Sequence, residues 1–166
     1  MDKEYFKKHV DEVFLPSILL CNEKGLVTVD CCAGLGKITY MSGRTNSKTH
    51  LFRDFPYVTF LKKGINQKAF DKFCSILKRY SVYDKYFEEK LPLFRIEGLK
   101  KDVGCSCPDR KLHDIPPKYR IGITNGLIEP IFNPNVNKIE KSKYKKKLYN
   151  VKKRWHKLFY EAIEEI

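Results

Sequence analysis

Residues 138–166, KIEKSKYKKKLYNVKKRWHKLFYEAIEEI, carry the most regular pattern in the sequence. Apolar side chains recur there at spacings of four, three, four, three and four, which is the period of one face of an α-helix. The residues of this apolar stripe are Tyr144, Leu148, Val151, Trp155, Leu158 and Ala162. The pattern predicts a helix of roughly 25 residues, with lysines and Arg154 on its remaining faces.

An apolar stripe on a basic helix packs against its own domain, a second copy of the chain, or a partner protein. Self-association or a protein partner would use Tyr144, Leu148, Val151, Trp155 and Leu158. A basic helix can also lie on an anionic membrane. Here, however, three acids close the helix, Glu161, Glu164 and Glu165. We therefore expect no membrane partner.

The positive charge of the chain is concentrated in two segments. Its 166 residues include 33 Lys and Arg against 20 Asp and Glu, a formal net charge of +13. Ten basic residues and one acid between Lys138 and Lys157 give a local charge of +9, and seven basic residues and one acid between Lys37 and Lys68 give +6, leaving −2 for the rest. Such concentration is typical of polyanion-binding proteins, because cations that neutralise phosphates release condensed counterions.

Upstream of the helix, alternating apolar and polar residues predict strands, whereas periods of three and four predict helices. In the first half we expect a helix at 3–14 that stops near Pro16, an apolar run at 18–20, strands at 27–31, 37–42 and 57–62, and a helix from Asn66, its N-cap, to Tyr80. In the second half we expect a helix at 82–89, a strand at 91–97, a loop at 99–117 and a hairpin at Asn125-Gly126.

These elements predict an α+β fold, with a small antiparallel sheet, packed helices and a long basic C-terminal helix. Residues 130–137 contain two prolines and three asparagines and predict a linker between an α+β domain at 1–129 and the helix at 138–166. No run of about 18 apolar residues occurs, and no apolar segment follows the charged N-terminus. We therefore expect an intracellular protein, cytoplasmic or nuclear, that is not secreted.

Aromatic and basic residues interleave between 37 and 68. Rings stack on unpaired bases while cations follow the phosphate backbone, a combination typical of single-strand binding sites. We expect Tyr40, Phe52 and Tyr57 to stack on bases. The predicted phosphate contacts are Lys37, Arg44, Lys48, Arg53, Lys62 and Lys63 in this segment, and Lys145, Lys146, Lys147, Lys152, Lys153 and Arg154 in the helix.

The order of elements in residues 17–80 loosely resembles a known nucleic-acid-binding family. Strands followed by the segment KKGINQKAFDKFCSIL are similar to the single-stranded-DNA-binding domain of positive-cofactor-type transcriptional coactivators. The resemblance covers about a third of the chain and rests on element order. It implies a twisted four-stranded sheet ahead of one helix, with two copies forming a dimer.

Cysteine spacing suggests a metal site. Without a secretion signal, the six cysteines are expected as thiols or metal ligands. Cys105, Cys107 and His113 supply three soft ligands within nine residues, and Cys31 or Cys32 could be the fourth. This set would hold zinc, which takes four such ligands. The alternative is two loop thiols and a surface histidine.

Two enzyme classes remain as alternatives. The segment VTVDCCAGLGKIT resembles the glycine-rich motif of S-adenosylmethionine-dependent methyltransferases, but a predicted strand follows it where that family has a helix. Asp30 and Glu97, each on a predicted strand, are candidate metal-binding acids of an RNase-H-like nuclease.

The sequence is therefore best interpreted as that of a non-enzymatic nucleic-acid-binding protein, contacting DNA or RNA mainly through the backbone and able to form a homodimer. Such a protein would act in transcription, replication or packaging. The main alternative is a structural subunit of a larger assembly that docks through the C-terminal helix. The Lys, Asn, Ile and Tyr usage of the chain is typical of an AT-rich genome, such as that of a virus or a parasite.

Overall fold

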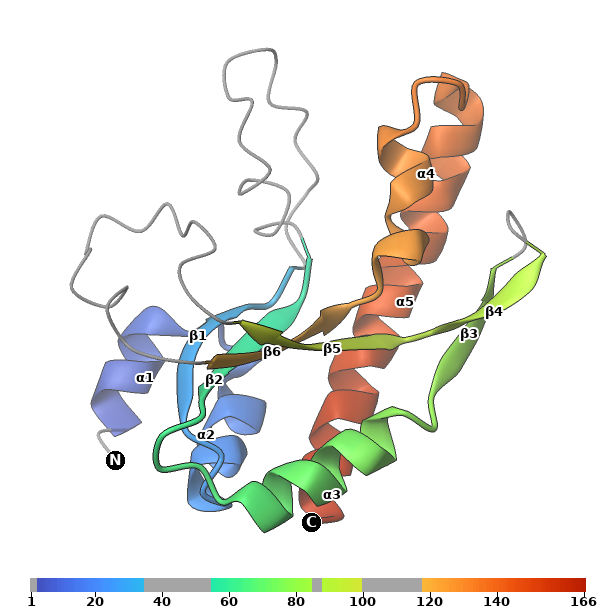
Figure 1. Cartoon of the computed structure of the whole chain (residues 1–166). Coiled ribbons are helices and arrows are strands. Elements are labelled where there is room, and N and C mark those ends of the chain that lie inside the picture. The colour runs from blue at the N-terminus through green and yellow to red at the C-terminus, as the bar shows by residue number, and fades with distance from the viewer. Residues whose placement is uncertain (1–2, 35–54, 85–87, 100–117) are drawn as a thin grey trace.

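The computed structural model describes residues 3–34, 55–84, 88–99 and 118–166 (Figure 1). It confirms the predicted fold class, a mixed α+β chain with an antiparallel sheet, packed helices and a long C-terminal helix. The helices are α1 (Lys3–His9), α2 (Leu15–Glu23), α3 (Gln67–Leu77), the 3₁₀ turn η3 (Asn125–Leu127), α4 (Glu129–Phe132) and α5 (Lys138–Glu164). The strands are β1 (Thr28–Cys32), β2 (Tyr57–Leu61), β3 (Ser81–Asp84), β4 (Glu89–Pro92), β5 (Phe94–Leu99) and β6 (Lys118–Ile123).

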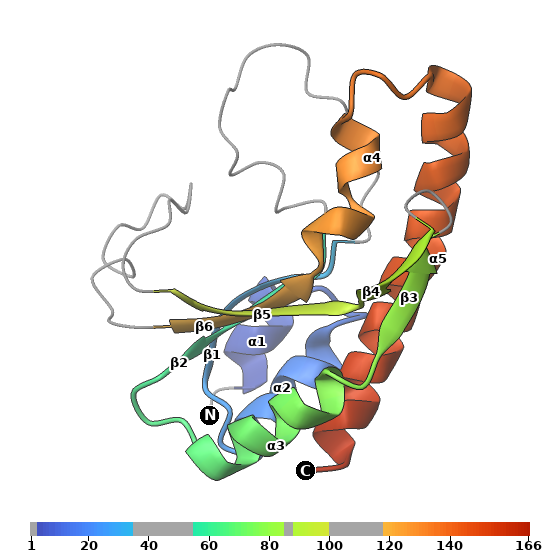
Figure 2. The ribbon, with the colours of Figure 1, turned by 45° about the vertical axis from the view of Figure 1, so that its right-hand side comes forward.

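Four strands form the main sheet in the order β1-β2-β6-β5, with every neighbouring pair antiparallel. Strands β3 and β4 form a separate antiparallel pair. In both views, α2 and α3 lie on one side of the main sheet and α4 on the other (Figures 1 and 2). The helix-covered face is apolar, because Val58, Ile121 and Ile96 lie opposite one another on adjacent strands.

Helix α5 contributes the centre of the aromatic core. The rings of Trp155 and Phe159 stack with centroids 4.8 Å apart, and Phe14 meets both edge-on. Phe73 of α3 and Phe94 of β5 also contact this pair of rings. All five side chains are at most 5 % exposed, so α5 is an integral part of the core.

The two longest helices begin with the same capping arrangement. The side chain of Asn66 accepts a hydrogen bond from the Ala69 amide, as predicted, and that of Asn137 accepts one from the Glu140 amide. Each cap provides a partner for one of the backbone N–H groups left unpaired at a helix start. Cys74 and Phe70 of α3 are both buried in the core.

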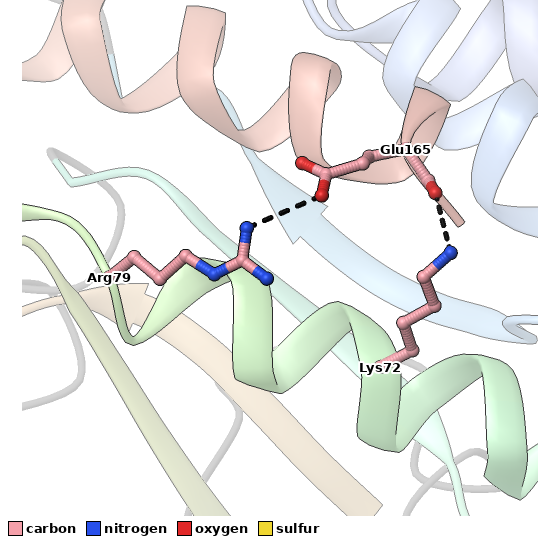
Figure 3. Close-up of polar contacts among 3 residues, drawn as sticks. All are labelled: Lys72, Arg79 and Glu165. Atoms are coloured by element: carbon pink, nitrogen blue, oxygen red, sulfur yellow. Dashed lines mark hydrogen bonds and ion pairs between the residues drawn. The ribbon is translucent and has the colours of Figure 1, made fainter.

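The C-terminal end of α5 is held against α3 by polar contacts (Figure 3). Lys72 donates a hydrogen bond of 2.8 Å to the backbone carbonyl of Glu165, and Arg79 lies 3.3 Å from the Glu165 carboxylate. Cations near the last carbonyls of a helix are favourable because that end carries partial negative charge. These contacts join the C-terminal end of α5 to α3.

The helix predicted at 3–14 is wrong in its end point. Helix α1 ends at His9, and Pro16 lies in the first turn of α2 rather than stopping a helix. Proline is tolerated there because the first turn needs no backbone N–H donor. The apolar run at 18–20 is therefore helical, and Ile18 and the following Cys21 are buried in the core.

Two predictions in the second half are also wrong. Residues 82–89 were expected to be helical, but the structure has β3 at Ser81–Asp84 and begins β4 at Glu89. The hairpin expected at Asn125-Gly126 is the 3₁₀ turn η3, which leads into α4. The strand predicted at 91–97 is divided between β4 and β5.

The segment predicted as a linker contains part of α4 and three buried residues, Pro130, Ile131 and Val136. The proposed division into residues 1–129 and 138–166 stays a prediction.

No helix among the described residues is long and apolar enough to cross a membrane. The strand expected at 37–42 lies outside the described residues, so β1 and β2 are the described strands ahead of α3.

Candidate nucleic-acid interface

One side of α5 is a continuous basic surface. We define the basic face of α5 as Lys143, Lys146, Lys147, Lys153, Arg154 and Lys157. All of these side chains are exposed except that of Lys147, which is partly exposed. Lys157 lies 3.8 Å from Glu161, and within the described part of the chain the other five have no carboxylate within ion-pair distance. The charge of this face is therefore available to an external anion.

The opposite side of α5 is buried in the protein's own core. Leu148, Val151 and Trp155 are 2 %, 8 % and 0 % exposed, and Tyr144 and Leu158 are partly buried. Residues of the apolar stripe thus contact α2, α3 and the sheet within the same chain. A protein partner at this stripe stays a hypothesis, and in this structure the stripe is covered by the chain itself.

Lys152 does not belong to the basic face. Its side chain is 2 % exposed, and its Nζ lies 4.7 Å from the centre of the Phe55 ring. Lys145, also predicted to contact phosphate, is partly buried, whereas Lys146 and Lys153 are exposed. The lysine-rich segment therefore divides into solvent-facing and core-facing cations, a division set by the helical period.

Contacts with strand β3 hold the basic face in place. The Tyr144 hydroxyl lies 2.9 Å from the buried Asp84 carboxylate and 2.6 Å from the Leu127 carbonyl. Burial, followed by the hydrogen bond to Asp84, raises the pKa of Tyr144 well above its usual value. Arg154 and Lys147 donate to the backbone carbonyls of Ser81 and Tyr83, at 3.3 and 3.5 Å.

The sheet face away from α2 and α3 carries an ordered array of polar residues. Asp30, Thr59, Arg120 and Glu97 form one cross-strand row from β1 to β5. In the next row on this face, Tyr57 lies opposite Gly122, which lies opposite Arg95. Paired residues of adjacent strands point to the same side, so these groups share one surface.

Most charges on this sheet face neutralise one another. Tyr57 donates a 3.0 Å hydrogen bond to Asp30, and the Arg120 guanidinium lies 4.9 Å from the Tyr57 ring centre. Arg95 pairs with Glu97 at 2.5 Å. Burial and the neighbouring Asp30 carboxylate raise the pKa of Tyr57 far above its usual value.

A pocket lies on the same sheet face. It is lined by Phe55, Pro56, Tyr57, Arg95, Glu97, Arg120, Gly122, Ile123, Asn125 and Ile128.

The structure does not bring the predicted contacts of 57–63 onto one surface. Tyr57 lies on the polar sheet face, whereas Lys62 places its Nζ 4.6 Å from the centre of the Tyr119 ring. Tyr119 stacks on Phe70 of α3, on the opposite side of the sheet. Lys63 is exposed in the turn before α3.

Several predicted site residues lie outside the described residues. They are Lys37, Tyr40, Arg44, Lys48, Phe52 and Arg53 of the nucleic-acid site, and Cys105, Cys107 and His113 of the zinc site. Within the described ranges, no group of three or more His, Cys, Asp or Glu side chains could hold a metal ion. Zinc binding stays a prediction. Burial raises the pKa of Cys31 to about 12, so this sulfur is a thiol at neutral pH.

The geometry of the described residues bears on the two enzyme alternatives. Asp30 and Glu97 lie on the same face, but β2 and β6 separate them by about 14 Å at ordinary strand spacing. Paired metal ions need carboxylates that meet within a few ångströms. The described strand pairs are all antiparallel, whereas the methyltransferase motif belongs to a parallel sheet.

His156 is a buried polar group on the core side of α5. Its Nε2 lies 2.6 Å from the carbonyl oxygen of Ala33, and its ring packs edge-on against Phe14. Because a carbonyl accepts, Nε2 carries the proton. Burial lowers the pKa of His156, the Lys152 charge lowers it further, and the Ala33 hydrogen bond and Asp11 act in the opposite direction. The group is therefore a structural imidazole, neutral at physiological pH.

Sequence reasoning did not identify two exposed tyrosines beside the basic face, Tyr83 and Tyr149. Tyr149 lies outside the apolar stripe, which is a signal that it faces solvent. Tyr83 was assigned to a helix, so the alternation of β3 was not recognised. No family model, curated protein or solved structure matched this chain.

Proposed function

We propose that this chain binds nucleic acid, with the basic face of α5 as its main contact with phosphate groups. The supporting observation is the exposure of Lys143, Lys146, Lys153 and Arg154 on one side of a helix whose other side is fixed in the core. A rigid helix presents its cations at fixed spacing. Its binding to phosphates therefore loses less conformational entropy than the binding of a disordered basic tail would. The local charge of +9 between Lys138 and Lys157 is the source of the attraction.

Binding through this face would be tolerant of sequence and steeply dependent on salt. Each neutralised phosphate releases counterions, so the logarithm of the binding constant falls with the logarithm of salt concentration. Residues 37–53, outside the described part of the chain, would supply a second set of contacts. The basic residues there are Lys37, Arg44, Lys48 and Arg53.

The test is fluorescence anisotropy with labelled oligonucleotides over about 50 to 200 mM NaCl. The variant changes Lys143, Lys146 and Lys153 to Gln, all exposed and outside the core. We expect the salt slope to decrease by about 3, one for each lost phosphate contact, and binding at low salt to weaken more than about tenfold.

A matched variant controls for the loss of net charge. Lys3, Lys8 and Lys78 are exposed lysines of α1 and of the C-terminal cap of α3, and their change to Gln removes the same charge elsewhere. The affinity of this control should stay within about threefold of the wild type, because salt screens the effect of the removed charges on a distant binding surface. Equal losses in the two variants would refute α5 as the contact surface.

A further inference from the structure

Two exposed aromatic rings border the basic face of α5. Tyr149 of α5 is 47 % exposed and Tyr83 of β3 is 55 % exposed. Tyrosine is intermediate in burial between apolar and charged residues, so exposure alone does not distinguish these two rings. Their position beside exposed cations does, because phosphates gain nothing from an aromatic face whereas an unpaired base next to the phosphate can stack on it.

The two rings lie on opposite borders of the cationic surface. At 100° per residue, Lys146 and Lys153 lie between Tyr149 and the edge formed by Lys147 and Arg154. That edge contacts β3, because Arg154 and Lys147 donate to the carbonyls of Ser81 and Tyr83. Figures 1 and 2 show β3 alongside α5. A strand crossing the helix would thus meet a ring, several cations and a second ring.

The orientation of Tyr83 is set by the alternation of β3. Val82 and Asp84 are buried, and Asp84 accepts the hydrogen bond from Tyr144 of α5. Ser81 and Tyr83 therefore point to the other side, into solvent. Lys90 of β4 lies directly opposite Tyr83 and is also exposed, so a cation accompanies this ring.

The Tyr149 ring has a cation of its own. The Nζ of Lys153 lies 4.7 Å from the ring centre, one helical turn along α5. Each exposed ring is thus paired with a lysine that can contact the phosphate next to a stacked base. Interleaved rings and cations are characteristic of single-strand sites, because the bases of a duplex are stacked on each other and present no free face.

We propose that the basic face of α5 selects single-stranded nucleic acid, with Tyr83 and Tyr149 stacking on unpaired bases. This inference rests on the proposed function, because the cations must bind phosphates for the rings to meet bases. Every base has a π-face, so the selection acts on strandedness and not on sequence. The chemistry is shared by single-stranded DNA and RNA.

The test compares the full-length protein and a Tyr83→Ala, Tyr149→Ala double variant on oligo(dT), oligo(U) and a mixed-sequence duplex. We expect the wild type to prefer the single strands over the duplex. The double variant should bind the single strands at least tenfold more weakly, as expected for the loss of two stacking contacts. Its duplex affinity and its salt slope should stay unchanged, because no cation is removed. Oligo(dU) is added as a third single strand, because it differs from oligo(U) in the sugar alone and so identifies the preferred sugar.

Two controls separate stacking from folding. Tyr83→Phe with Tyr149→Phe keeps both rings and should restore binding, and Tyr5→Ala removes an exposed ring of α1, 56 % exposed, without effect. If the double alanine variant keeps full single-strand affinity while binding remains salt-dependent, the stacking proposal is overturned and the phosphate-binding function stands. If the wild type binds none of the four probes in a salt-dependent way, both proposals fail.

Discussion

Two polar side chains on the core side of α5 contact the chain close to the two ends of segment 35–54. His156 bonds to the carbonyl oxygen of Ala33, and Lys152 lies over the ring of Phe55. Gly34 and Phe55 are in close contact, because a Cβ at Gly34 would lie 2.2 Å from the Phe55 carbonyl carbon, and Gly34 has φ +62°. His156 and Lys152 therefore make contacts within the chain itself.

At this residue scale, His156 makes stability dependent on pH. Its pKa is lowered in the folded protein, so the unfolded chain takes up a proton first as pH falls below about 6.5. The unfolded state then binds more protons, and the free energy of unfolding decreases with falling pH. His156→Gln keeps an N–H donor for Ala33 but does not titrate, so we expect a flatter profile. Urea unfolding between about pH 5 and 8 measures this slope, and equal slopes in both proteins would contradict the assignment.

At the scale of elements, α5 depends on β3 for the position of its basic face. Tyr144→Phe removes the hydroxyl that contacts the buried Asp84 carboxylate and the Leu127 carbonyl. We expect a loss of about 1–3 kcal/mol in the free energy of unfolding, because a buried acceptor loses a donor. Tyr149→Phe, at an exposed ring, is the matched control and should change stability by less than about 0.5 kcal/mol. Equal changes in chemical denaturation would show that the Tyr144 hydroxyl contributes nothing.

The same element explains which features the sequence could predict. Helix α5 and the Asn66 cap were predicted because periodicity and capping are local signals. Strand β3 was not predicted because Asp84 is 0 % exposed. A charged residue stands at a buried position, so the sequence does not show the alternation of apolar and polar residues that indicates a strand. Lys152 was misplaced for the same reason, since a charged residue is normally assigned to solvent. Both exceptions depend on partners distant in sequence, which no local pattern contains.

At the scale of the whole molecule, one helix supplies both the centre of the core and the main basic surface. The sequence suggested that residues 130–137 separate these roles into two parts. In the structure, the side chains of α5 that are at most 8 % exposed and lie in the common core are Leu148, Val151, Trp155, Phe159, Ala162 and Ile163. Surface charge and core packing are therefore coupled, and only substitutions on the exposed side change binding without changing the fold.

This coupling predicts that residues 1–137 do not fold alone. Loss of a buried Trp or Phe side chain alone costs about 3–5 kcal/mol, and the truncation removes both Trp155 and Phe159 together with six other buried side chains of α5. The loss is therefore comparable with the total stability of about 5–15 kcal/mol that is typical of a domain. Because the single tryptophan of the chain leaves with the helix, circular dichroism during heating is the appropriate measurement. We expect a cooperative transition for the full chain and none for residues 1–137. A cooperative transition in the truncated chain would instead establish an independent domain ahead of α5.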